Sequence, residues 1–208
     1  MERAEAVSRL TTLVGQDLRQ LADQLNVTVW SKDNKKNKGW AGHTIERYLG
    51  LALNSSRSPN FGSWELKLVP LVVRVVRGSR VLRVKETMAI TMIDPVEVES
   101  REFEESHLFN KLQRIVVVAR IFESQADKRS IVHSVASFDL NDPKIYDQVK
   151  ADYNLVRETI RTKGFSSLSG KMGKLVQPRT KGQGHGSTSR AFYARKEFVA
   201  HILGLRED

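Results

Sequence analysis

The stretch that decides the fold is Phe61-Gly62-Ser63-Trp64-Glu65-Leu66-Lys67-Leu68-Val69-Pro70-Leu71. Its large apolar residues alternate with other residues, which predicts a β-strand with two different faces. Glu65 and Lys67 are expected on one face of this strand, opposite the face that carries Trp64. The strand therefore presents a carboxylate and an ammonium group side by side.

Such a pair offers the groups that a metal-dependent phosphodiesterase needs. The carboxylate can hold a divalent cation, while the lysine can orient or activate the attacking water and offset charge on the phosphorane. Glu65 and Lys67 alone leave an alternative open, which is an ordinary ion pair on a half-exposed strand. The rest of the chain has to separate the two interpretations.

Size and composition predict one domain, with room for a smaller lobe. The chain has 208 residues, 40% of them hydrophobic, and lacks the run of roughly 20 apolar residues that a membrane-spanning helix needs. Its first residues do not resemble a signal peptide, and it contains no cysteine, which fits a reducing compartment. We therefore expect a cytoplasmic protein with no membrane partner.

The formal net charge is +10, from 34 basic and 24 acidic side chains. This excess suits a polyanionic partner, because each phosphate that a cation neutralises releases condensed counterions. Charge alone leaves open a basic protein that binds no nucleic acid.

The patterns along the chain predict a mixed α/β domain, with a central sheet and helices on its faces. One helix is expected over about the first thirty residues, a second over about 41–53 and a third from about 143 to about Lys163. Asn141-Asp142-Pro143 is a typical start for the third helix, and Gly164 ends it. Strands are expected over 64–76, 80–93, 114–122 and 130–140. The second helix carries Glu46 beside its inner face, where a solvated glutamate is the alternative interpretation.

Two polar segments separate these elements. The lysine-rich stretch 31–40 is either a solvated loop or an arm that touches phosphates. Residues 165–190 are rich in Ser, Gly and Lys, and form either a linker or a functional loop between two core elements.

Several short motifs occur along the chain. Each is weak by itself, but their order and spacing together are more specific. In chain order they are Lys38-Gly39-Trp40-Ala41-Gly42, Ile45-Glu46, Tyr48-Leu49-Gly50, Asn60-Phe61, Glu65-Leu66-Lys67, Ser106-His107, Asn110-Lys111-Leu112, Gln177-Pro178-Arg179-Thr180-Lys181-Gly182 and Arg190-Ala191-Phe192-Tyr193. With these motifs the chain resembles the MutH family of sequence-specific DNA endonucleases, from about Lys38 to Leu203. That family comprises a mismatch-repair nicking enzyme and related restriction enzymes of restriction-endonuclease-like fold.

The resemblance implies one endonuclease domain over 1–208, with a catalytic part to about 140 and a DNA-reading part from about 141. It implies Mg²⁺ as cofactor, with Ca²⁺ or Mn²⁺ as substitutes, and double-stranded DNA as partner. The implied catalytic positions are Glu46, Asn60, Glu65 and Lys67, of which Glu46, Asn60 and Glu65 would hold the metal. The implied DNA-binding positions are Lys38, Lys111, Arg179, Thr180, Lys181 and Tyr193.

One position departs from the family pattern. Asn60 stands where the family places an aspartate as a second carboxylate for magnesium. An amide oxygen brings no charge, and hard cations favour carboxylates, so metal binding should be weakened. Two interpretations are open, an engineered and inactivated form of an active nuclease or a natural variant.

The resemblance leaves the role of the enzyme open. A restriction enzyme that cuts both strands, working as a homodimer on a site such as GATC, is one expectation. A methylation-sensing nicking enzyme with mismatch-repair partner proteins is the second. A non-catalytic DNA-binding module is a third expectation, from another class, and a basic RNA-binding protein is disfavoured because the chain lacks an aromatic stacking signature.

Overall fold

The computed structural model describes residues 1–50, 62–182 and 188–205. Asn60, the position that departs from the family pattern, lies outside these residues. Among the residues described, no helix is both long enough and apolar enough to cross a membrane.

Two sheets form the framework, and the first contains the predicted strands. Its order is β2-β1-β4-β5, with β1 at Glu65–Val76, β2 at Ser79–Val84, β4 at Arg114–Ile121 and β5 at Val132–Asp139. Strand β1 runs parallel to β4, and the other pairs in this sheet are antiparallel. The second sheet has the order β3-β7-β6, with β3 at Met88–Met92, β6 at Val176–Thr180 and β7 at Arg190–Ala194.

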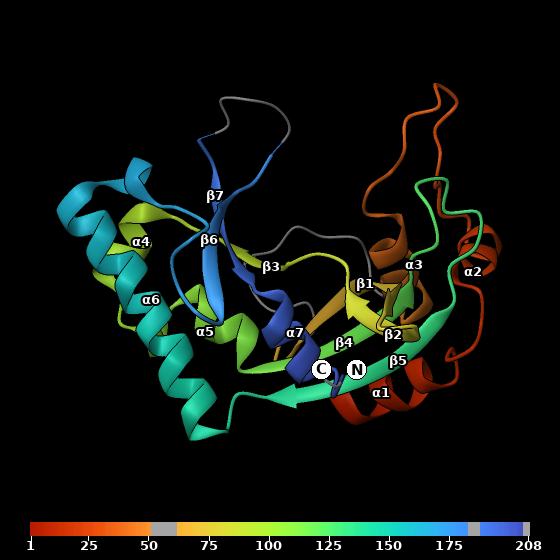
Figure 1. Cartoon of the computed structure of the whole chain (residues 1–208), viewed down its shortest axis with the longest axis horizontal. Helices are drawn as coiled ribbons and strands as arrows, with labels where there is room; N and C mark the ends of the chain where they lie inside the picture. The colour runs from red at the N-terminus through yellow and green to blue at the C-terminus, as the bar shows by residue number, and fades with distance from the viewer. Residues whose placement is uncertain (51–61, 183–187, 206–208) are drawn as a thin grey trace.

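Helices cover the first sheet from both sides (Figure 1). The N-terminal group is α1 at Arg3–Thr11, α2 at Leu18–Gln24 and α3 at Trp40–Tyr48. The other group is α4 at Pro95–Ser100, α5 at His107–Leu112, α6 at Pro143–Lys163 and α7 at Lys196–Ile202, with single-turn helices at Phe103–Glu105 and Phe165–Ser167. The predicted mixed α/β class, with a mixed sheet and helices on its faces, is confirmed.

Alternation along the strands divides the core into two clusters. Trp64 and Leu66 pack with the N-terminal helices, whereas Val69 and Leu71, on the other face of β1, pack with the C-terminal helices and the second sheet. The apolar run of β4 divides in the same way, since Val116 belongs to the first cluster and its neighbours to the second. Strand β4 is thus covered on both faces, as its sequence predicted.

Three boundaries differ from the prediction. The first helical region is two helices, because Gly15 between them has a φ of +84°, which continues no helix. The helix expected over about 41–53 ends at Tyr48, where Gly50 has a φ of +80°. The stretch 80–93 is two strands in different sheets, because β2 ends at Val84 and β3 pairs instead with β7.

The stretch 165–190 was predicted to be a linker or a functional loop. Instead it supplies the strand β6, which pairs with β7 from Val176↔Ala194 to Thr180↔Arg190. Its short apolar run gave no clear strand signal, although its partner β7 begins only ten residues after β6 ends.

Candidate active site

Glu65, at the start of β1, is almost fully buried, with 2% of its surface exposed. Lys67, on the same face of the strand, places Nζ 2.7 Å from Glu65 Oε1. Lys111 on α5 donates a hydrogen bond to the same oxygen at 3.3 Å. The Nζ of Lys67 also donates to the carbonyl oxygen of Ile90 at 3.3 Å, which joins this cluster to strand β3. Two ammonium groups therefore share one carboxylate oxygen.

Glu46 reaches the same cluster from helix α3. Burial raises the pKa of Glu46 above its ordinary value, and the nearby charge of Glu65 raises that pKa further. His43 and Lys67 act in the opposite direction and lower the pKa of Glu46. Because interactions between single charges weaken with distance, these effects show that Glu46 lies within electrostatic range of Glu65 and Lys67. The structure brings together the three described residues that were predicted as catalytic.

Lys67 sits in surroundings that disfavour its charged form. Burial lowers the pKa of Lys67, and the hydrogen-bonded Glu65 carboxylate raises that pKa in part. The positive charges of Lys111 and Lys181 lower it further. A lysine whose pKa is lowered in this way gives up its proton more readily than an exposed one, which suits contact with a reacting water.

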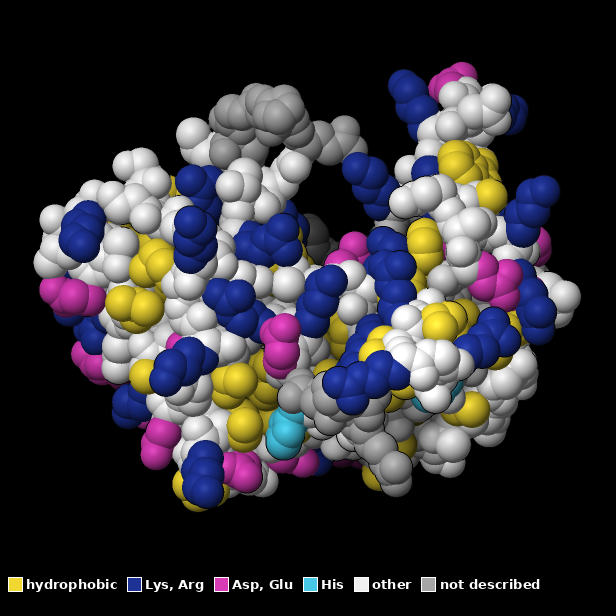
Figure 2. Space-filling model, viewed as in Figure 1, with side chains coloured by type: hydrophobic (Ala, Val, Ile, Leu, Met, Phe, Trp, Pro, Cys, Tyr) yellow, Lys and Arg dark blue, Asp and Glu magenta, His cyan; other side chains and the backbone are white. Residues whose placement is uncertain are grey.

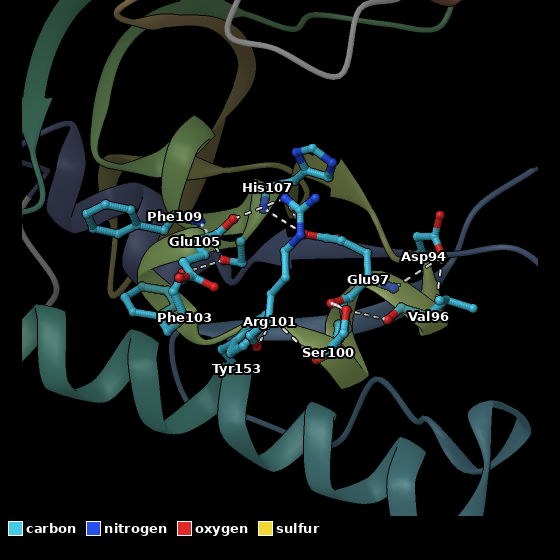
Figure 3. Close-up of polar contacts among 12 residues, drawn as sticks. Asp94, Val96, Glu97, Ser100, Arg101, Phe103, Glu105, His107, Phe109 and Tyr153 are labelled. Carbon is cyan, nitrogen blue, oxygen red and sulfur yellow. Dashed lines mark hydrogen bonds and ion pairs between the residues drawn. The ribbon is translucent and has the colours of Figure 1, made fainter.

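A short polar network fixes the segment that leads to Lys111 (Figure 3). Glu97 of α4 accepts a hydrogen bond from the backbone N–H of His107 at 3.1 Å and lies 3.9 Å from the guanidinium of Arg101. The hydroxyl of Ser106 accepts from the backbone of α5 and so caps its N-terminus. Through these contacts α4 determines where α5, and with it Lys111, can lie.

The second sheet contributes the residues predicted to read DNA. The guanidinium carbon of Arg179, on β6, lies 5.7 Å from the ring centre of Tyr193 on β7. Arg179 also donates to the hydroxyl of Thr87 at 2.8 Å. Burial raises the pKa of Tyr193, and the adjacent Arg179 lowers it in part. Both side chains are thus held in place before any ligand is bound.

One cavity joins these residues to the catalytic cluster. Its volume is about 500 Å³. It is lined by Lys67, Leu68, Val69, Pro70, Glu86, Thr87, Met88, Ala89, Arg179, Thr180 and Tyr193. The exposed Thr180 accepts a hydrogen bond from Arg190 at 3.0 Å, and the exposed Lys181 acts electrostatically on Lys67. Lys67 and three of the residues predicted to read DNA, Arg179, Thr180 and Tyr193, therefore line one cavity.

Lys38, the remaining predicted DNA contact, belongs to a basic arm formed by residues 31–39. The arm is held at its base by Asp127, which is 1% exposed and lies 2.6 Å from Lys36 Nζ. The same carboxylate accepts hydrogen bonds from the indole of Trp40 at 3.1 Å and from Arg120 at 3.0 Å. Lys38 itself is exposed and lines a second cavity of about 570 Å³ beside the first.

The arm and the second sheet stand on opposite sides of a hollow, with the first sheet beneath (Figures 1 and 2). Lys and Arg side chains gather on both walls of the hollow in Figure 2. This distribution of positive charge suits a ligand that carries phosphates.

The described residues contain no group of three or more His, Cys, Asp or Glu side chains that could hold a metal ion. Glu46 and Glu65 nevertheless supply two carboxylates, and the charge of Glu65 disfavours the charge of Glu46. Oxygen ligands of this kind fit Mg²⁺, which would relieve the repulsion between them. The third predicted position, Asn60, lies outside the described residues.

Two buried carboxylates that position the site were missed by sequence reasoning. Asp127 anchors the arm, and Asp152 of α6, which is 2% exposed, accepts hydrogen bonds from the backbone at the start of β6. The signal for Asp152 was present, because an acid falls within the apolar stripe of α6 between Val149 and Val156. Asp127 lies in an irregular loop and gave no such signal.

Comparisons with known proteins show which family the chain resembles. A family model described as "DNA mismatch repair enzyme MutH" matches residues 49–152. A DNA mismatch repair protein MutH from Haemophilus ducreyi is 29% identical, over 96% of this chain and 92% of the relative. One from Vibrio cholerae is 26% identical, over 96% and 94%. A solved complex of the restriction endonuclease MvaI with cognate DNA aligns over 89% of this chain and 94% of that one, with a TM-score of 0.36 and 13% identity.

Proposed function

Because the chain belongs to the MutH family, we propose that it is a metal-dependent endonuclease that hydrolyses a phosphodiester bond of double-stranded DNA at a short specific site. The observation that carries the proposal is the ion pair of the buried Glu65 with Lys67, within electrostatic range of Glu46, where Lys67 lines a cavity together with Arg179. Relatives whose names assign them to DNA mismatch repair support DNA as the substrate.

Each group has a role that follows from its surroundings. Glu46 and Glu65, together with the residue at position 60, would hold Mg²⁺, which when bound supplies a Lewis acid that polarises the phosphoryl oxygen. Lys67, with its lowered pKa, would contact the attacking water and stabilise the negative charge that develops on the phosphate. Lys111 would orient Glu65 by its 3.3 Å hydrogen bond.

The second sheet would select the site. The guanidinium of Arg179 can donate two hydrogen bonds to guanine in the major groove, worth about 1–3 kcal/mol of discrimination. Tyr193, which lies beneath that guanidinium, would sense the neighbouring base, including methylation of an adenine. We expect a GATC-like sequence, on the basis of the family resemblance.

The relatives favour the nicking alternative over the restriction enzyme, because they are named for mismatch repair. A nicking enzyme would cut one strand and depend on repair partner proteins, whereas a restriction enzyme would cut both strands as a homodimer. Digestion of supercoiled plasmid with a single GATC site separates the two alternatives. The nicking enzyme gives open circles, and the restriction enzyme gives linear DNA. Plasmid methylated at adenine tests the sensing role of Tyr193.

Because position 60 carries an asparagine, the cleavage test compares the unaltered chain with Asn60→Asp. An amide in place of a carboxylate should weaken Mg²⁺ binding, so we expect Asn60→Asp to raise Mg²⁺-dependent cleavage strongly above that of the unaltered chain. Adding Lys67→Ala to Asn60→Asp should lower the rate by about 10²–10³ and leave DNA binding intact. If Asn60→Asp binds duplex DNA and leaves it uncut in Mg²⁺ or Mn²⁺, both alone and with mismatch-repair partner proteins added, the metal site is misassigned and the chain is a DNA-binding module.

A further inference from the structure

Strand β1 and strand β2 extend beyond the rest of the first sheet as a two-stranded ribbon, residues 72–83. The pairing of β1 with β4 ends at Leu71↔Ile121, whereas its pairing with β2 continues to Val76↔Ser79. Five further residues at about 3.4 Å each carry the ribbon roughly 17 Å past the sheet. The ribbon therefore projects beyond the end of the sheet at Leu71, four residues along β1 from Lys67.

The ribbon is strongly basic. Between Leu66 and Lys85 the sequence contains no acidic residue. It contains Lys67, Arg74, Arg77, Arg80, Arg83 and Lys85. Arg74 and Arg80 are exposed, and so is Val75, with 71% of its surface accessible. Such a density of cations on a ribbon without a large core indicates a role outside the packing of the fold.

The register of the strands assigns the arginines to different faces. Arg74 pairs with Val81, and one position along Val75 pairs with Arg80, so that Arg74 and Arg80 lie on opposite faces. Arg83, opposite Val72, shares the face of Arg74. Each face can therefore be tested by a single substitution that removes the same charge.

The face of Arg74 continues to the second cavity and the arm, whereas the face of Val75 and Arg80 is the one that carries Lys67. By the same alternation, Pro70 and Lys85 share the face of Arg74, and they are joined by a backbone hydrogen bond of 2.9 Å. Pro70 and Lys85 line the second cavity together with the exposed Lys38 of the arm. A row of cations thus leads from the arm, past the cavity, to the outer end of the ribbon.

We infer that the ribbon face bearing Arg74 and Arg83 binds the phosphate backbone of duplex DNA outside the cleaved site, an inference that rests on DNA being the substrate. A length of about 17 Å along the duplex corresponds to about five base pairs at 3.4 Å per base pair. These contacts would carry no sequence information and would add affinity and register. The opposite face, with Arg80 and Val75, would stay in solvent.

The test compares two matched variants on two duplexes. Fluorescence anisotropy measures the affinity of the full chain, without metal, for a duplex of about ten base pairs centred on GATC and for one extended by about ten base pairs at each end. We expect the unaltered chain to bind the longer duplex more tightly, with a steeper dependence on salt. Arg74→Gln should lose most of this gain, with a salt slope on the long duplex reduced by about 0.9.

Arg80→Gln is the control, because it removes one exposed charge from the other face of the same ribbon. It should keep both the gain in affinity and the salt slope, and thermal unfolding should show that both variants fold. Equal effects of Arg74→Gln and Arg80→Gln, or no gain from the longer duplex, would overturn the inference and leave DNA as the substrate. Failure of the unaltered chain to bind either duplex would overturn the proposed function as well.

Discussion

The backbone N–H of Val176 donates a hydrogen bond of 2.8 Å to the carboxylate of Asp152 on helix α6. Val176 is the first residue of β6, so this buried carboxylate holds the start of the strand that carries Arg179. The same carboxylate accepts from the N–H groups of Lys174 at 2.8 Å and Leu175 at 2.7 Å. Three successive backbone donors thus converge on one side chain. This arrangement couples the position of the second sheet to the longest helix of the molecule.

Asp152→Asn should destabilise the fold and impair DNA binding. An amide presents one acceptor and a donor group to three N–H donors, and hydrogen bonds to charged groups are worth about 1.5–3 kcal/mol each. We expect the free energy of unfolding to fall by about 2–3 kcal/mol in urea denaturation. Asp147→Asn, an exposed acid on the same helix, is the control and should change little. An unchanged midpoint for Asp152→Asn would contradict the coupling.

Gly173→Ala should disturb the same turn. Gly173 has a φ of +72°, and a Cβ atom there would lie 1.9 Å from the carbonyl oxygen of Val176. Gly15→Ala is the comparison, because its φ is +84° but a Cβ atom would meet nothing within 4 Å. Backbone strain alone costs about 1–2 kcal/mol, so Gly15→Ala should lose about that much. Gly173→Ala should lose clearly more, as thermal or urea unfolding would measure, and equal losses would count against the contact.

Lys36→Gln should loosen the basic arm. The pair between Lys36 and the buried Asp127 ties the arm to the connection between β4 and β5, while Arg120 still satisfies the carboxylate in the variant. If the substitution lowers the local stability of the arm by about 1 kcal/mol, the arm should open about fivefold more often. Hydrogen exchange of the arm's backbone amides measures how often the arm opens. Lys35→Gln removes the same charge from an exposed neighbour and should leave exchange unchanged.

Glu104→Gln should reduce sensitivity to acid. Hydrogen bonds from Lys150 at 2.6 Å and Tyr146 at 2.5 Å lower the pKa of Glu104 from 4.5 to about 2. The ionised carboxylate therefore stabilises the fold above about pH 4.5, and this contribution is lost as the pH falls toward about 2. The effect is small, because the side chains of Lys150 and Glu104 are 41% and 42% exposed.

The stability of the unaltered chain and of Glu104→Gln can be measured by unfolding followed by circular dichroism across this pH range. The difference in stability between the unaltered chain and Glu104→Gln should shrink as the pH falls. Glu105→Gln, which removes a charge from the next exposed residue, provides the baseline. A difference that stays constant down to about pH 2 would rule out the ion pair as its source.

The sequence by itself determined the elements whose signals are local. The alternation from Trp64 to Leu71 predicted a strand with Glu65 and Lys67 on one face, and Asp142-Pro143 and Gly164 marked both ends of α6. These predictions are confirmed because a strand's two faces and a helix's caps depend on neighbouring residues. The family resemblance further indicated which side chains belong together, without saying how they meet.

Only the tertiary structure decided how the second sheet is assembled. Strand β3 separates from β2 after Val84 and pairs with β7 from the other end of the chain, which brings the carbonyl of Ile90 to Lys67. No local pattern encodes such a pairing, because its hydrogen bonds form only after distant segments meet. For the same reason Asp127 and Asp152 could not be assigned their partners from sequence, since a buried carboxylate takes whatever donors the finished fold brings to it.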